Sequence, residues 1–169
     1  DIGFGDILER CVVPHISRHH SDENCYNTYE GRQEVVDLVD RTVKRWTSLY
    51  QQLKAESPGS TIYVIGYPSI ASDIGKCSIN VRLDKNELEF AEELVHYMND
   101  SIRQAAMDAG APYVDIEHAL SGHRLWEASG SSVAGNGRTA GSDFGIFGIG
   151  LLGRESYHPN ALGHQLIEQ

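Results

Sequence analysis

The sequence predicts an α/β domain in which helices pack in layers against a parallel sheet. Three observations lead to this prediction. The 169 residues are 40% hydrophobic and 22% charged, which is enough apolar material for one core of ordinary size. Two long segments have the three-and-four spacing of amphipathic helices, and a short apolar run follows each of them. Helices and strands that alternate along a chain are typical of a parallel sheet covered by helices.

The composition is acidic, with 24 aspartates and glutamates against 14 lysines and arginines and a formal net charge of −10. A surface of this sign repels phosphates and anionic lipids, so nucleic acid and anionic membranes are disfavoured as main partners. No run approaches the roughly 18–20 apolar residues that cross a bilayer, and no signal peptide is visible. The opening D-I-G-F-G-D resembles the interior of a domain, and we expect the natural chain to begin earlier.

The first long helix is expected from Arg32 to Glu56. Before it, residues 1–13 suit a loop that leads into a short helix, and residues 14–30 are polar and irregular, as in a surface loop. Ser57-Pro58-Gly59 ends the long helix. Its apolar face consists of Val35, Val36, Val39, Val43, Trp46, Tyr50 and Leu53. The run T-I-Y-V-I-G-Y-P at 61–68 then has the character of a strand buried in a parallel sheet.

The second half repeats this pattern after a loop at residues 69–83. Asp84 and Glu87 form a capping-box pattern that opens a second helix, and Gly110 closes it. The inner face of this helix carries Leu88, Ala91, Leu94, Val95, Met98, Ile102 and Ala105. A strand, P-Y-V-D-I, is expected at 112–116. Two strands are too few to bury helices on both faces, so either further strands escape the pattern or the fold begins before Asp1.

The remaining chain consists of a long loop and a last helix. Residues 127–153 are rich in glycine and serine, and we expect no regular structure there. A loop of this length within a compact domain is usually functional or disordered, and its apolar residues at 144–151 favour packing against the domain. Residues 159–169 suit a final helix with Pro159 in its first turn.

The candidate for catalysis is His158, with Glu155 three residues earlier in E-S-Y-H-P-N-A-L-G-H. A hydrolytic base needs an imidazole whose second nitrogen is held by an acceptor. A carboxylate or a carbonyl three residues earlier in a tight turn can supply that acceptor. The spacing alone fits a surface histidine at a helix N-terminus equally well, so the sequence context must decide.

Other polar groups have simpler interpretations. His15, His19, His20 and Asp22 lack the regular spacing of a metal site and suit a solvated loop. His118 and His123 flank Gly122 and suit either a pocket or a polar loop. No serine lies in a Gly-x-Ser-x-Gly elbow, so none of the serines of the glycine-rich loop is a candidate nucleophile, namely Ser131, Ser132 and Ser142. Asp6 and Asp115 suit a helix start and a strand end, and no phosphate-binding loop is present.

Four stretches, in the right order, resemble the GDSL, or SGNH, hydrolase family. The strongest is H-P-N-x-x-G-H at 158–164, which is similar to the family's last catalytic block. The opening D-I-G-F resembles the sequence after the family's Gly-x-Asn-Asp motif, so that Asp1 would be the last residue of that motif. V-I-G-Y-P-S at 64–69 and Y-V-D-I-E-H-A-L-S-G-H-R-L at 113–125 are similar to its later strands and loops.

The resemblance implies a single three-layer α/β/α domain over residues 1–169, flavodoxin-like and incomplete at its N-terminus. It implies hydrolysis of a carboxylic ester, such as a lipid or an acylated carbohydrate, through an acyl-serine, with His158 as general base and Glu155 holding its ring. The Gly-Asp-Ser block and the oxyanion asparagine lie outside this sequence. A missing N-terminal segment or a second chain would supply them, and this chain alone would be inactive. Because an incomplete fold would expose a sheet edge and apolar helix faces, we also expect a homodimer or a proteolytic remnant. The alternative is a non-catalytic binding or assembly module.

The resemblance also implies no cofactor or metal, a secreted or cell-surface location, and an acyl pocket walled by Phe144, Ile146 and Phe147. Secreted relatives favour a bridge between Cys11 and Cys25, although three buried thiols also fit the residues themselves. Trp126 stands where many secreted relatives have a cysteine, which would leave Cys77 without its usual partner.

Overall fold

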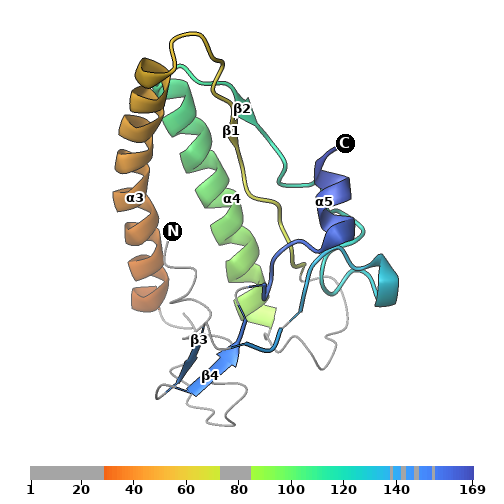
Figure 1. The fold of residues 1–169 in the computed structure, drawn as a ribbon. Coiled ribbons are helices and arrows are strands. Elements are labelled where there is room, and N and C mark those ends of the chain that lie inside the picture. The colour runs from red at the N-terminus through yellow and green to blue at the C-terminus, as the bar shows by residue number, and fades with distance from the viewer. Residues whose placement is uncertain (1–28, 73–84, 138, 142–143, 147–148, 154) are drawn as a thin grey trace.

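The computed structural model describes residues 29–72, 85–137, 139–141, 144–146, 149–153 and 155–169. Two long helices stand side by side and run in the same direction, and two short strands run beside them in the opposite direction (Figure 1). The helices are α3 (Tyr29–Glu56) and α4 (Lys85–Asp108), and the strands are β1 (Val64–Ile65) and β2 (Tyr113–Val114). The order helix, strand, helix, strand predicted from the sequence is confirmed, with α3 beginning three residues before Arg32 and both strands shorter than expected.

The strands form a parallel pair in which Val64 faces Tyr113 and Ile65 faces Val114. One face of this pair packs on the helices. Val64 and Ala111 contact Ile102 and Ala106 of α4, and the partly buried neighbours of this cluster are Trp46, Tyr50, Met98 and Tyr113. Trp46, Tyr50, Met98 and Ile102 belong to the helix faces that periodicity predicted, whereas Ala106 of α4 was not among the predicted residues.

Close packing explains one glycine and one asparagine in this core. A Cβ on Gly66 would lie 2.2 Å from the Tyr113 hydroxyl and 2.9 Å from Asn99 Oδ1, so no larger residue fits there. Asn99 of α4 is fully buried. Its side chain accepts a hydrogen bond from Tyr67 N at 2.7 Å and donates to Tyr67 O and to Glu117 Oε2. Asn99 therefore fixes the backbone where β1 ends, because a buried amide satisfies groups that water cannot reach.

The glycine-rich segment differs from expectation. β3 (Phe144–Ile146) and β4 (Ile149–Leu152) pair in antiparallel orientation as the two strands of a hairpin, with a register irregularity at Phe144/Gly145. The prediction that this segment lacks regular structure is wrong for these residues, since an alternating glycine–aliphatic sequence can still pair its backbone as a ladder. A short 3-10 turn, η2 (Gly130–Ser132), precedes the hairpin.

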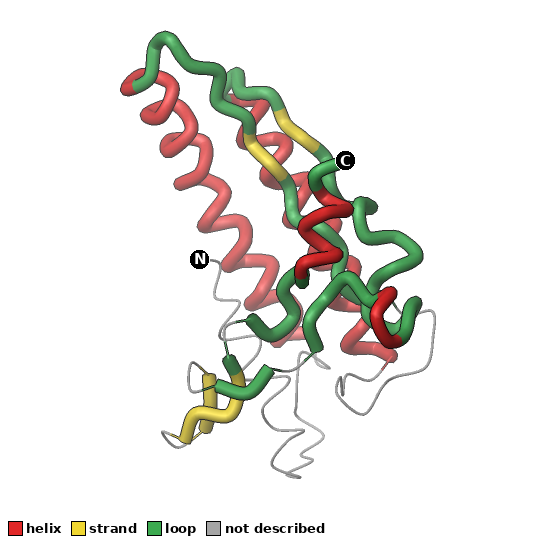
Figure 2. The backbone as a smooth tube through the Cα atoms, turned by 45° about the vertical axis from the view of Figure 1, so that its right-hand side comes forward, coloured by secondary structure: helices red, strands yellow, loops and turns green. Residues whose placement is uncertain are grey.

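The last helix, α5 (Ala161–Ile167), lies near the strands (Figures 1 and 2). Asn160 is its N-cap, and the Asn160 side chain accepts a hydrogen bond from Gly163 N. Pro159 therefore precedes the cap. The sequence had instead suggested that Pro159 lies in the first turn of the helix. Three predicted features lie outside the described residues: Asp84 of the capping box, the loop and short helix within residues 1–13, and all three cysteines.

Candidate active site

His158 lies in a tight turn directly before α5. The turn is closed by a hydrogen bond from His158 N to Glu155 O, and Tyr157 adopts a positive φ of 60°. A non-glycine residue in this region is uncommon and costs about 1 kcal/mol or more. The buried position of Tyr157 and the hydrogen bonds on both sides of it hold the turn in this conformation.

The ring of His158 is oriented by the main chain. Its Nδ1 lies 3.1 Å from the carbonyl oxygen of Ser156. A carbonyl can only accept, so Nδ1 carries the proton and the lone pair of the neutral imidazole lies on Nε2. The sequence had assigned this orienting role to Glu155. In the structure the ring acceptor is instead Ser156, while the Glu155 carbonyl binds His158 N and Asn136 Nδ2.

Ser156 is itself held rigidly. It is fully buried, its Oγ accepts from Thr139 N at 3.0 Å, and it shares a second 3.0 Å hydrogen bond with Thr139 Oγ1. A buried hydroxyl with these partners cannot serve as a nucleophile, and its role is to fix the carbonyl that faces His158.

The turn is anchored to residues 133–136 on its other side. Asn136 N donates to His158 O at 2.8 Å, Asn160 N donates to Ala134 O at 2.9 Å, and Asn160 Nδ2 donates to Val133 O at 2.7 Å. A Cβ on Gly163 would lie 2.3 Å from Ala134 O, so α5 can approach this segment only with glycine at that position. The spacing H-P-N-x-x-G thus has a physical explanation. Asn160 caps α5 and also binds residues 133–134, and Gly163 lets the helix contact Ala134, so that both hold His158 in its turn.

Residues 133–136 connect in turn to the ends of the strands. Ala134 N donates to His123 O at 2.7 Å, and Leu125 N donates to Ile70 O at 2.8 Å. Ile70 follows β1, so His158 is linked through two hydrogen-bonded segments to the carboxyl end of that strand. Ligands of open α/β folds bind at this end of the sheet.

An ion-pair cluster fixes the intervening loop. Arg124 donates to Glu92 Oε1 at 2.8 Å and to Glu127 Oε1, and its side chain is only 11% exposed. Glu127 Oε2 also accepts from Gly122 N at 2.8 Å. The hydrogen bond with Arg124 lowers the pKa of Glu127 below its ordinary value, and the same hydrogen bond raises the pKa of Arg124.

Nearly the whole chain matches a known family. The model of the GDSL-like lipase/acylhydrolase family covers residues 1–166. The chain belongs to this family. The α/β fold and the family predicted from the four sequence motifs are therefore confirmed.

Individual relatives agree with this assignment. The chain is 30% identical to Lipase 2 of Streptomyces coelicolor over 119 residues, which cover 69% of this chain and 37% of that protein. The crystal structure of a phospholipase A1 from Streptomyces albidoflavus superposes with a TM-score of 0.73 and 26% identity, over 98% of this chain and 60% of the other. An extracellular lipase from Streptomyces rimosus superposes with a TM-score of 0.68 at 17% identity, over 99% and 63%. The GDSL-like chain thus spans less than two thirds of the length of these relatives.

The other predicted site residues of this GDSL-like domain have separate outcomes. Phe144 and Ile146 lie in β3, while Phe147 lies outside the described residues. The acyl pocket therefore stays a prediction. His15, His19, His20, Asp22, Asp6 and Ser142 also lie outside them. Within the described ranges, no group of three histidine, cysteine or acidic side chains is arranged to hold a metal.

The remaining candidates have local roles or lie exposed. His123 Nδ1 faces Ser132 O at 3.0 Å. Asp115 pairs with Arg103 and accepts from Glu117 N. His118 and Ser131 are exposed.

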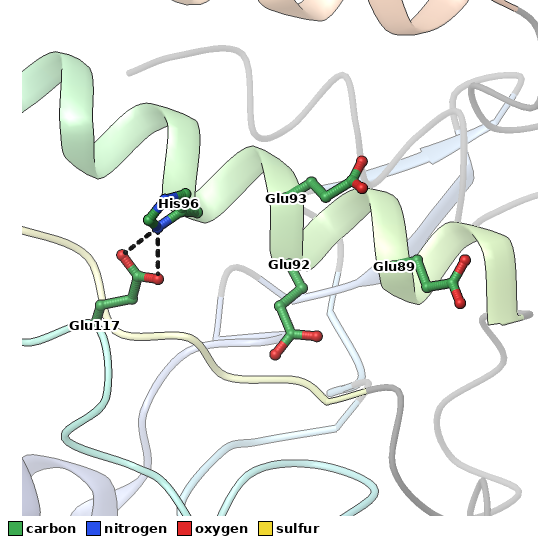
Figure 3. A pocket seen from close by; sticks show the side chains of 5 residues that line it. All are labelled: Glu89, Glu92, Glu93, His96 and Glu117. Atoms are coloured by element: carbon green, nitrogen blue, oxygen red, sulfur yellow. Dashed lines mark hydrogen bonds and ion pairs between the residues drawn. The ribbon is translucent and has the colours of Figure 1, made fainter.

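An open hollow of about 360 Å³ lies on α4, lined by Glu89, Glu92, Glu93, His96 and Glu117 (Figure 3). His96 Nδ1 and Glu117 Oε1 are 3.1 Å apart within it. None of the predicted catalytic or acyl-binding residues lines this hollow, and an acidic wall disfavours a carboxylate product, so we do not assign it to ester binding.

Sequence reasoning missed the roles of Ser156, Asn160 and Gly163. One signal was available, because an asparagine just after a proline and three residues before a glycine is a good N-cap candidate. The partnership of Ser156 and Thr139 has no such signal, since it joins residues 17 positions apart.

Proposed function

We propose that this chain is the histidine-bearing part of a carboxylic ester hydrolase of the lipase or esterase type that acts through an acyl-serine. The observation that carries the proposal is the orientation of His158 by the Ser156 carbonyl at 3.1 Å. That contact sets the tautomer in which Nε2 accepts a proton, and a general base must present an acceptor to the hydroxyl that it activates.

In this proposal His158 Nε2 takes the proton of the attacking serine and then gives it to the leaving alcohol. The hydrogen bond to Ser156 O keeps the ring in one orientation through both steps. The Glu155 carbonyl helps to close the turn, and its carboxylate is not needed. We further propose that Phe144, Ile146 and Phe147 form one wall of the acyl pocket, as the apolar residues of the glycine-rich segment suggest.

The nucleophile and the oxyanion donors come from outside these 169 residues, since the sequence contains no Gly-Asp-Ser block. We propose that they belong to a segment of the natural polypeptide beyond this sequence. The shares of 37–63% that the chain covers in its relatives support this view. We also propose secretion, which the description of the Streptomyces rimosus lipase as extracellular supports. No helix in the described part of the chain is long and apolar enough to span a membrane.

The test is ester turnover by the natural full-length polypeptide, measured with p-nitrophenyl esters of short and long acyl chains. We expect His158→Ala to lower kcat by about 1,000-fold or more without changing the thermal midpoint by more than about 2 °C. Glu155→Gln is expected to stay within about twofold of the parent, because the main chain orients the ring. His164→Ala is the matched control, since His164 is an exposed histidine of α5.

Unchanged turnover in His158→Ala would remove this residue from the mechanism. A loss of turnover in Glu155→Gln as large as in His158→Ala would return the orienting role to the carboxylate. A full-length polypeptide without any ester turnover would favour the alternative of a binding module that keeps the fold.

A further inference from the structure

Arg124 lies where three parts of the domain meet. Its side chain is only 11% exposed, and its Nη1 donates to Glu92 Oε1 of α4 at 2.8 Å. The same Nη1 donates at 3.4 Å to the Oγ of Ser69, which follows β1. Its Nη2 donates to Glu127 Oε1, three residues later in the chain. One guanidinium thus joins α4, the chain after β1 and the loop at 122–127.

Glu127 closes the loop around Arg124. Glu127 Oε2 accepts from Gly122 N at 2.8 Å and from Arg124 N at 3.3 Å, while Oε1 accepts from the guanidinium. The Glu127 side chain is 15% exposed, so water competes little for these contacts. A guanidinium presents its donors in a fixed planar fork, which a lysine ammonium cannot reproduce. The conformation of residues 122–127 therefore depends on an arginine at position 124.

Leu125, the residue after Arg124, joins the loop to the chain that follows β1. Leu125 N donates to Ile70 O at 2.8 Å, and Leu125 O accepts from Ser72 N at 3.2 Å. These two bonds form a parallel bridge between Leu125 and Ala71. Leu125 is also buried. The loop is therefore held against the chain at the carboxyl end of β1.

His123, the residue before Arg124, joins the loop to the histidine turn. His123 O accepts from Ala134 N at 2.7 Å, and Ala134 O accepts from Asn160 N at 2.9 Å. Asn160 is the N-cap of α5 and lies two residues after His158. Two successive backbone hydrogen bonds thus connect the neighbour of Arg124 to the neighbourhood of the imidazole. A displacement of the loop is expected to move the histidine turn with it.

Burial distinguishes Arg124 from a surface arginine with similar partners. Arg103 also pairs with two carboxylates, Asp100 at 2.7 Å and Asp115 at 3.3 Å, but its side chain is 39% exposed. Exposed ion pairs contribute little, because water replaces a lost partner. Removal of one member of a buried pair leaves the other charge without compensation. Arg103 is therefore the matched control for Arg124.

We propose that Arg124 is a positioning residue for His158. The guanidinium holds the loop at 122–127 against α4 and β1, and the loop holds the histidine turn. Arg124 acts through the backbone and is not a catalytic residue. The inference rests on the proposed function, because the placement of His158 matters for turnover only if its Nε2 takes the proton of the serine. A misplacement of about 1 Å can lower a rate about 100-fold.

The test measures ester turnover by the natural full-length polypeptide, at a temperature where circular dichroism shows each variant to be folded. We expect Arg124→Met to lower kcat by about 30-fold or more and to change KM by less than about twofold, because the base moves and the ester-binding surface does not. Arg124→Lys keeps the charge without the fork, so its kcat should lie between the two. Arg103→Met should leave kcat within about twofold of the parent.

A spectroscopic measurement separates positioning from a loss of stability. Nitrogen-15 chemical shifts of the His158 ring report which nitrogen carries the proton. The parent should show the form protonated at Nδ1, as the 3.1 Å contact with Ser156 O requires. Arg124→Met should show a mixture of the two tautomers, whereas a purely structural role would lower Tm and leave the ring signals unchanged.

Glu92→Gln keeps the proposal testable if Arg124→Met does not fold. The Glu92 side chain is 39% exposed, so the substitution is compatible with folding, and it weakens one contact of the guanidinium. We expect kcat to fall by about three- to tenfold. Glu93→Gln is the control, because Glu93 is the next residue of α4, is exposed, and leaves the helix on a different side (Figure 3). It should leave kcat unchanged.

Two results would overturn the proposal. The first is a folded Arg124→Met, or Glu92→Gln in its place, with kcat within twofold of the parent and unchanged ring signals of His158. The second is an equal loss of kcat in the control variants of Arg103 and Glu93, which would show a general sensitivity to surface charge. Retained turnover in His158→Ala would instead refute the proposed function. The ring signals would then still decide whether Arg124 orients His158, because they do not depend on turnover.

Discussion

Gly163→Ala offers the sharpest test of how α5 holds the histidine turn. In most helices this substitution stabilises, because alanine has the better helix propensity by up to about 1 kcal/mol. Here the new Cβ would lie 2.3 Å from Ala134 O and 2.9 Å from Pro159 Cβ. Backbone atoms cannot rotate away as a flexible side chain can. The helix must therefore move from residues 133–136, or the segment must move from the helix.

The expected change in the free energy of unfolding is the cost of overpacking and of a lengthened hydrogen bond, minus the gain in helix propensity. Overpacking of this kind costs about 1–3 kcal/mol, and the displacement also lengthens the 2.9 Å hydrogen bond from Asn160 N to Ala134 O, which contributes about 1 kcal/mol. After subtraction of the propensity gain, we expect a net loss of about 2 kcal/mol in the free energy of unfolding. For a chain of this size that corresponds to a decrease of about 4–8 °C in Tm.

The assay is thermal unfolding followed by circular dichroism, with urea denaturation as a second measure. Gly59→Ala is the matched control, because a Cβ at Gly59 meets nothing within 4 Å and its φ is not positive. We expect the control to be neutral or slightly stabilising. If Gly163→Ala proves as stable as Gly59→Ala, the close approach of α5 is not a constraint, and our explanation of the H-P-N-x-x-G spacing is wrong.

Two further substitutions test the polar contacts around the site. Asn99→Ala should lower the free energy of unfolding by about 3 kcal/mol in urea titrations, because the fully buried Asn99 side chain makes three hydrogen bonds, to Tyr67 N, Tyr67 O and Glu117 Oε2. Gln104→Ala, on the exposed side of α4, should lower it by less than about 0.5 kcal/mol, and equal losses would contradict this account. Glu127→Gln should remove a pH-dependent contribution to the free energy of unfolding. The pKa of Glu127 in the folded protein lies below its ordinary value of 4.5. The contribution of the Glu127 carboxylate to stability is therefore present above about pH 4.5 and is lost as the pH falls through the folded pKa. The stability difference between parent and Glu127→Gln should accordingly be constant from pH 6 to 8 and shrink below about pH 4.5, and a difference that grows on acidification would refute the sign.

The sequence by itself determined the family, the order of the helices and strands, and the identity of His158 as the candidate base. These are local properties. A three-and-four spacing specifies an amphipathic face whatever lies beside it, and the motif at 158–164 is contiguous, so neither required knowledge of contacts between distant residues.

Only the tertiary structure decided which carbonyl orients the imidazole and why the motif has its spacing. Ser156 reaches its position because Thr139 holds its hydroxyl, and Gly163 is required because Ala134 lies against it. Those partners come from a glycine-rich segment whose conformation the sequence could not predict. Its hairpin depends on backbone pairing between strands, which the side-chain pattern of one strand does not specify.

The exposure of Tyr63, Ile65 and Tyr67 along β1 likewise became visible only in three dimensions. From the sequence, residues 61–68 suit a strand buried on both faces, whereas the structure leaves Ile65 57% exposed. The side-chain pattern describes the environment for which a strand is suited, and the coordinates describe the environment that these residues provide.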